Sequence, residues 1–72
     1  MQWNLLKLRK EFGYSQKDVA KILNISIEAY RNKELGKNQF KMNEMFLLSD
    51  LFGEDISDIF LEAKSTVREQ KG

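Results

Sequence analysis

The feature that most constrains the fold is the stretch from Ser15 to Glu34, SQKDVAKILNISIEAYRNKE. It contains two short amphipathic helical patterns, and only Asn24, Ile25 and Ser26 separate them. A break this short forces the second helix to leave at a steep angle to the first. The first helix therefore supports the second from behind, and the far face of the second helix stays in solvent.

Local signals agree with this arrangement. Ser15 can cap the first helix, and Asp18, three residues later, suits a capping box and the positive end of the helix dipole. Asn24 stands where the chain must leave that helix, and Asn adopts left-handed dihedrals more readily than other non-glycine residues. Ser26 can cap the next helix. The pattern therefore predicts a helix-turn-helix over about residues 16–34.

The spacing of the apolar residues gives both helices an inward face and gives the second helix an outward face as well. The positions expected to face inward in the two helices are Val19, Ala20, Leu23, Ala29, Tyr30 and Lys33. The positions expected to face outward are Ile27, Glu28, Arg31 and Asn32. In a DNA-binding protein, an outward face of this kind enters the major groove.

These outward side chains fit a mixed reading surface. Glu28 can accept a hydrogen bond from a cytosine amino group, Asn32 can pair with adenine, and Arg31 can reach guanine or phosphate. Ile27 suits a thymine methyl group. The simpler interpretation of Glu28 is an acid that the first turn of a helix favours.

Basic or amide side chains flank the expected reading helix. Those that we expect to contact phosphate are Lys17, Lys37, Asn38 and Lys41. The alternative is that lysines such as Lys17 and Lys21 are ordinary solvated side chains.

The segment LRKEFGYSQKDVAKILNIS, followed by Tyr30, Glu34 and Gly36, resembles the Cro/repressor-type (XRE-like) helix-turn-helix family of phage and bacterial regulators. The resemblance covers roughly residues 4–60, and the later GEDISDIF is similar to the segment that begins the family's fifth helix. The matching positions are Arg9, Ser15, Gln16, Ala20, Glu34 and Gly36. The chain departs from the family pattern at Asn24, usually Gly, and at Phe40, often Pro.

The resemblance implies an all-α, compact five-helix domain that reads operator DNA. It implies that Gln16 contacts a phosphate or a base at the edge of the site. It also implies that Arg9 and Glu34 form a partly buried salt bridge between the first and third helices. Breaking one partner of such a pair costs more than the pair contributes, so these two residues are expected to be structural.

A pass along the whole chain predicts helices over about 3–12, 16–23, 27–35, 43–52 and 56–61, in one domain of residues 1–63. The polar tail, residues 64–72, is expected to fray. The residues expected in or near the core, besides the inward positions above, are Trp3, Leu5, Leu8 and Phe12.

The net charge of +1 hides a strong segregation. Residues 1–41 contain nine Lys or Arg and four Asp or Glu, a net charge of +5. Residues 42–63 contain six acids and no Lys or Arg, a net charge of −6, and residues 64–72 carry +2. Such a dipole would orient the expected reading helix toward phosphate. The alternative is that the charge runs are solvated faces with no partner.

Composition argues against several other classes. The sequence has no Cys and no His, which excludes disulfides, removes the usual zinc ligands and leaves no usual general base or thiol nucleophile. We therefore expect no enzyme activity, no cofactor, no metal and no small-molecule substrate. Without a stretch long enough to span a membrane or an apolar leader segment, we expect a cytoplasmic protein without membrane contact.

The helix over 43–52 carries more apolar residues than one face can bury. Met42, Met45, Leu48, Ser49 and Phe52 are expected to pack on the domain. The residues expected to form a partner interface are Leu47, Leu51, Phe60 and Leu61. The alternative is that the polar tail folds back over them. The partner is expected to be a second copy in a homodimer, or a cognate phage repressor that the protein modulates by binding. An antitoxin or restriction-control regulator is a third class with the same domain.

Overall fold

The computed structural model describes residues 1–60, which form five α-helices, and the all-α prediction is confirmed. The helices are α1 (Trp3–Glu11), α2 (Gln16–Leu23), α3 (Ile27–Leu35), α4 (Met42–Phe52) and α5 (Ile56–Phe60). Every predicted boundary within this range agrees to one residue. The expected helix end at Leu61, the domain boundary at 63 and the tail 64–72 lie outside the described residues. No helix within residues 1–60 combines the length and the apolar character that a membrane crossing requires.

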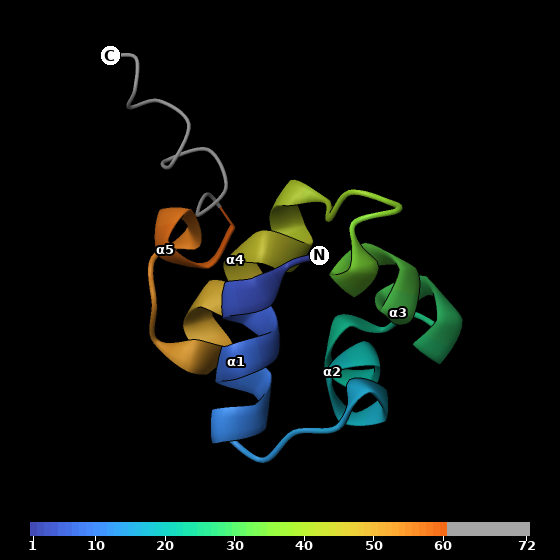
Figure 1. The fold of residues 1–72 in the computed structure, drawn as a ribbon, viewed down its shortest axis with the longest axis horizontal. Helices are drawn as coiled ribbons and strands as arrows, with labels where there is room; N and C mark the ends of the chain where they lie inside the picture. Colours follow the sequence, from blue (N-terminus) through green and yellow to red (C-terminus); the bar gives the residue numbers. More distant parts are fainter. Residues whose placement is uncertain (61–72) are drawn as a thin grey trace.

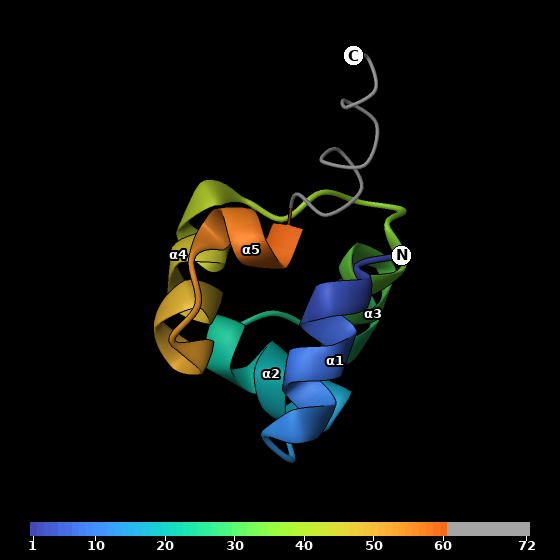
Figure 2. The same ribbon diagram turned by 60° about the vertical axis from the view of Figure 1, so that its left-hand side comes forward.

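The helix-turn-helix lies on one side of the molecule (Figure 1). Helices α2 and α3 pack on each other there, and α5 packs on α1 and α4. In Figure 2, α1 lies in front of α3, and α4 lies on the other side of the molecule. This arrangement leaves α3 at the edge of the domain, on the opposite side from α5.

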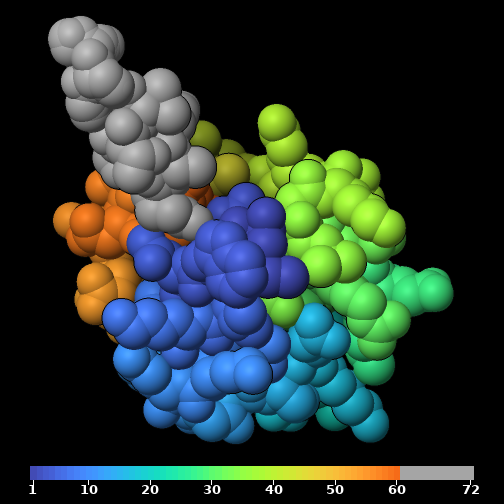
Figure 3. All heavy atoms as spheres, viewed as in Figure 1, coloured from blue at the N-terminus to red at the C-terminus, as the bar shows by residue number. Residues whose placement is uncertain are grey.

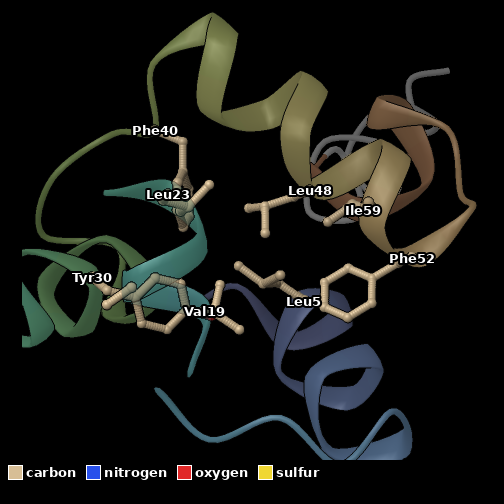
Figure 4. Packing of buried hydrophobic residues seen from close by; sticks show 9 residues of the cluster. Leu5, Val19, Leu23, Tyr30, Phe40, Leu48, Phe52 and Ile59 are labelled. Atoms are coloured by element: carbon tan, nitrogen blue, oxygen red, sulfur yellow. The ribbon is translucent and has the colours of Figure 1, made fainter. Parts of the chain in front are cut away.

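Side chains from all five helices meet in one core (Figure 4). The buried apolar residues are Leu5, Val19, Ala20, Leu23, Tyr30, Phe40, Leu48, Phe52 and Ile59. Phe40 belongs to the loop between α3 and α4, and its ring lies 6.1 Å from that of Tyr30. The core therefore fixes both the reading helix and the loop that follows it.

Trp3 of α1 lies outside this core, contrary to prediction, whereas Phe12, the residue after α1, lies at the edge of the core. Trp3 is 62% exposed and Phe12 is 50% exposed. The buried face of α1 is defined by Leu5 and Arg9, and Trp3, two residues before Leu5, points away from that face because successive residues turn by about 100°. Phe12 follows the end of α1, and its ring contacts Phe52 edge-on with centroids 5.1 Å apart.

The buried face of α4 agrees with the expected one except at its first turn. Leu48 and Phe52 are buried, and Met45 and Ser49 are half-buried, as predicted. Met42, however, is 60% exposed, and Glu44, which was not predicted to face inward, is buried. A glutamate is seldom expected on the inner face of a helix. Glu44 lies inside because it pairs with Lys33 of α3.

Candidate nucleic-acid interface

The two predicted caps of the helix-turn-helix are present. The Ser15 hydroxyl accepts a hydrogen bond from the Asp18 N–H at 3.1 Å, and the Ser15 N–H donates to the Asp18 carboxylate at 2.9 Å. These hydrogen bonds lower the pKa of Asp18, the largest contribution coming from the Ser15 backbone. The Ser26 hydroxyl accepts from the Ala29 N–H at 3.0 Å. Both helices therefore begin where the sequence indicated.

The turn between α2 and α3 depends on Asn24, which has φ 61° and ψ 44°. Among the non-glycine residues of the described range, 1–60, Asn24 alone has a positive φ. The backbone N–H groups of Asn24 and Ile25 donate to carbonyl groups of the last turn of α2. Ile25 then packs against the core. One left-handed residue and one apolar anchor thus set the angle at which α3 leaves α2.

A buried polar network supports α3 from behind. Arg9 Nε lies 2.8 Å from Glu34 Oε2, which confirms the expected salt bridge between the first and third helices. The Tyr30 hydroxyl donates to the same oxygen at 2.9 Å. Gln16 Nε2 donates to Glu34 Oε1 at 2.8 Å, and Arg9 also donates to the Tyr14 carbonyl. The network joins α1, α2 and α3 at one carboxylate.

The network holds Glu34 as a carboxylate. Burial by itself raises the pKa of Glu34, but the hydrogen bonds from Arg9, Gln16 and Tyr30 outweigh it, and the pKa lies below the ordinary value. Burial is also the main reason that the pKa of Tyr30 is raised, with the Glu34 charge adding to it. At neutral pH the tyrosine therefore remains a hydrogen-bond donor to the carboxylate.

The opposite side of α3 meets solvent, as predicted. Ile27 is 37% exposed, Glu28 and Arg31 are exposed, and Asn32 is half-buried. The inward prediction for the other face also holds, because Tyr30 and Lys33 are buried and Ala29 is half-buried. In the space-filling view, α3 and the loop after it form one edge of the molecule (Figure 3).

Cationic and amide groups surround this edge. Lys17, Lys37, Asn38 and Lys41 are all exposed. The loop that carries three of them is held to α3, since the Lys37 and Asn38 N–H groups donate to the Asn32 carbonyl at 2.9 and 3.3 Å. Gln16 differs from these residues: it is half-buried, and its amide is engaged by Glu34.

The expected interface residues do not form one exposed surface. Leu47 is 43% exposed, whereas Leu51 and Phe60 are half-buried and pack against the core. Leu61 lies outside the described residues. The more exposed apolar pair on α4 is Met42 and Phe46, at 60% and 56%.

Sequence reasoning missed Met42 and Phe46 as a pair, although their i, i+4 spacing was a usable signal. It also missed the partner of Lys33. A lysine on an inward face needs a carboxylate, which was a usable signal, but the sequence alone does not say which acid supplies it.

Of the acids in residues 42–60, Glu44 pairs with Lys33 of α3, and Asp50, Glu54, Asp55 and Asp58 are exposed on or beside α4 and α5. Helix α5 lies on the opposite side of the molecule from α3 (Figure 3). Within the described part of the chain, no group of three or more acidic side chains is arranged to hold a metal ion. The exposed face of α3 is thus flanked by the exposed cations Lys17, Lys37 and Lys41.

Comparison with known proteins gives one family. The family model HTH_3, described as helix-turn-helix, matches residues 5–59. No curated protein and no solved structure matches the chain. The matched range includes α2, α3 and α4 in full and most of α1 and α5.

Proposed function

Because this chain belongs to the helix-turn-helix family of Cro/repressor-type DNA-binding transcription regulators, we propose that it binds operator DNA with α3 in the major groove. The observation that carries this proposal is the division of α3 into two faces. One face is fixed by the buried Arg9–Glu34–Tyr30 network, and the other presents exposed polar side chains to solvent.

The proposed base contacts follow from the chemistry of the exposed face. Glu28 accepts from a cytosine amino group, Asn32 pairs with adenine and Arg31 donates to guanine or phosphate. Ile27 contacts a thymine methyl group. Lys17, Lys37, Asn38 and Lys41 contact the phosphate backbone on either side.

Gln16 keeps its proposed place at the edge of the operator. Its Nε2 donates to Glu34, and because an amide nitrogen carries two hydrogens, one remains for a phosphate oxygen. The free backbone N–H groups in the first turn of α2 also favour a phosphate at this place. Glu34 therefore orients Gln16 before DNA arrives.

This proposal is tested by selecting a binding site from a random duplex library and measuring single variants on the selected duplex. Glu28→Ala and Asn32→Ala should each lose about 1–3 kcal/mol of binding free energy and relax the base preference at one position. Lys17→Ala should weaken binding to all sequences alike. Failure to enrich any sequence, with all three variants binding as the wild type does, would contradict the proposal.

The operator reader is proposed to work as a homodimer, since one helix-turn-helix reads only a short half-site. A groove of about 730 Å³ lies between the residue before α1, the α3–α4 loop, α4 and α5. Its apolar lining is Phe40, Met42, Met45, Ile56 and Phe60, and its polar lining is Gln2, Gln39, Ser57 and, at the edge next to the proposed phosphate contacts, Asn38. No charged residue lines it, although 32% of the chain is charged. Two copies related by a two-fold axis can bring such a surface together without like-charge repulsion.

Sedimentation tests the homodimer with two matched variants. Met42→Glu places a charge at the groove and should give a monomer, whereas Leu47→Glu, on the other flank of α4, should leave the dimer intact. A wild type that remains monomeric at every concentration, or a dimer that survives Met42→Glu, would contradict this interface.

The resemblance to small phage regulators supports a role in a phage-type genetic switch. The alternative mechanism within such a switch is modulation of a cognate repressor by direct binding. Exposed Leu47 beside the acidic Asp50 favours a basic protein partner on that flank. Under this alternative, Leu47→Glu abolishes activity in cells, and changes of Ile27, Glu28 or Asn32 have little effect.

A further inference from the structure

A second buried ion pair lies behind the reading helix, separate from the Arg9–Glu34 network. Lys33 Nζ is 2.7 Å from Glu44 Oε1 and 2.9 Å from Glu44 Oε2. The two side chains are only 11% and 4% exposed. Lys33 belongs to α3 and Glu44 to α4, so the pair spans the loop between these helices.

The Glu44 carboxylate also fixes the far end of that loop. It accepts the Lys41 N–H at 2.8 Å, while Lys33 Nζ lies 6.0 Å from the centre of the Phe40 ring. At the near end, the Asn32 carbonyl accepts the N–H groups that begin the loop. Residues 37–41 are therefore attached to α3 at both ends, with their exposed cations between the two attachments.

Stability alone does not account for charged groups at this place. Removing two charges from water is costly, and an apolar pair of similar volume is often as stable or more stable. An ion pair with two short contacts, whose carboxylate also accepts a backbone N–H, instead fixes direction. The carboxylate accepts hydrogen bonds from α3 and from the loop simultaneously, which no apolar side chain can do.

We propose that Lys33 and Glu44 are positioning residues for DNA binding. Their ion pair sets the loop 37–41 relative to α3, so that Lys37, Asn38 and Lys41 meet the phosphate backbone while α3 contacts the bases. The inference rests on the proposed function. It assigns an effect on DNA affinity to two buried residues that do not themselves contact DNA.

Two double variants test the proposal. Lys33→Met with Glu44→Leu removes the ion pair and the acceptor for Lys41, and Lys33→Met with Glu44→Gln removes the ion pair but keeps an acceptor oxygen. Both leave the net charge at +1. Changing Lys33 alone would leave a buried unpaired carboxylate and destabilise the fold, which is why the pair is changed together.

Three quantities are measured for each variant: the melting temperature, the hydrogen-exchange rate of the Lys41 amide in the free protein, and the affinity for a random-sequence duplex over a range of salt. The Met/Leu variant should melt at or above the wild-type temperature, yet exchange the Lys41 amide faster and bind about tenfold more weakly. In a plot of the logarithm of the binding constant against the logarithm of salt concentration, the magnitude of the slope should decrease by about 0.9 for each phosphate that the loop no longer reaches. The Met/Gln variant should lie closer to the wild type in both exchange and affinity.

Two results would overturn the inference. One is that both double variants keep the wild-type affinity and salt slope. The other is that affinity falls only in proportion to the unfolded fraction, which is what a purely structural pair would give. A third result, a wild type that binds no duplex at any salt concentration, can be told apart from these two, because it contradicts the proposed function as well as this inference.

Discussion

At the scale of single residues, the domain depends on two buried carboxylates. Glu34 collects hydrogen bonds from Arg9, Gln16 and Tyr30, and Glu44 collects them from Lys33 and the Lys41 backbone. Each carboxylate ties α3 to a different neighbour. The back of the reading helix is thus held by charge at two points as well as by the apolar core.

Removal of Arg9 should therefore be costly. Arg9→Ala leaves the Glu34 charge buried without its main partner, and we expect a loss of about 3–5 kcal/mol in the free energy of unfolding. Small domains have only about 5–15 kcal/mol in total. Urea unfolding measures the loss, and Lys10→Ala, a neighbouring exposed position, should change it by less than about 0.5 kcal/mol. A loss below about 1 kcal/mol for Arg9→Ala would show that the network is not structural.

The same carboxylates should make stability depend on pH in the acid range. Burial raises the pKa of each, but hydrogen bonds, chiefly from Arg9 to Glu34 and from Lys33 to Glu44, outweigh it, so both pKa values lie below the ordinary 4.5. The unfolded chain then binds more protons than the folded one as the pH falls. The stabilisation is therefore fully present above the unfolded pKa and is lost as the pH falls through the folded pKa values.

Urea unfolding between about pH 6 and pH 3 measures this dependence. The Lys33→Met/Glu44→Leu variant lacks one of the two carboxylates, so acidification should cost it less than the wild type. Equal losses in the two proteins would mean that Glu44 does not contribute.

At the scale of elements, the sequence predicts α2, the turn and α3 almost to the residue. The reason is that their ends are determined by local chemistry: the Ser15 and Ser26 caps and the left-handed Asn24 each act within a few residues. The inward position of Glu44 in α4 could not be predicted in the same way. Glu44 is turned inward by Lys33, eleven residues earlier in the chain, and hydrophobic periodicity contains no record of such a partner.

The candidate interface shows the same limit. The outward face of α3 follows from helical spacing, whereas the bond that draws Gln16 to Glu34 links positions eighteen residues apart. The exposure of Trp3 likewise depends on which side of α1 meets the other helices. Tertiary contacts settle these details, and a single sequence does not record them.

The turn between α2 and α3 gives a prediction at this scale. Asn24→Ala places a Cβ-bearing residue without Asn's local hydrogen-bonding capacity at φ 61°, and should cost about 1–2 kcal/mol of stability. Asn24→Gly should stay within about 0.5 kcal/mol of the wild type, because glycine adopts this conformation freely. Thermal unfolding of the two variants side by side makes the comparison. An alanine variant as stable as the glycine variant would contradict the role assigned to the turn.

At the scale of the whole molecule, the distribution of charge agrees with the position of α3. The segment with net charge +5, residues 1–41, contains the helix-turn-helix, and the segment with net charge −6, residues 42–63, begins at α4. Exposed acids lie on or beside α4 and α5, and α5 lies across the domain from α3. A duplex approaching this dipole is attracted to the α3 side and repelled by the other.

The most direct test of the central claim is the affinity of the purified protein for a random-sequence DNA duplex, measured over a range of salt concentrations. If α3 and its flanking cations contact DNA, the logarithm of the binding constant should fall linearly with the logarithm of salt, by about 0.9 per phosphate contacted. Arg31→Ala together with Lys37→Ala should reduce both the affinity and the slope. Negligible binding at low salt, by wild-type protein that is folded, would contradict the account.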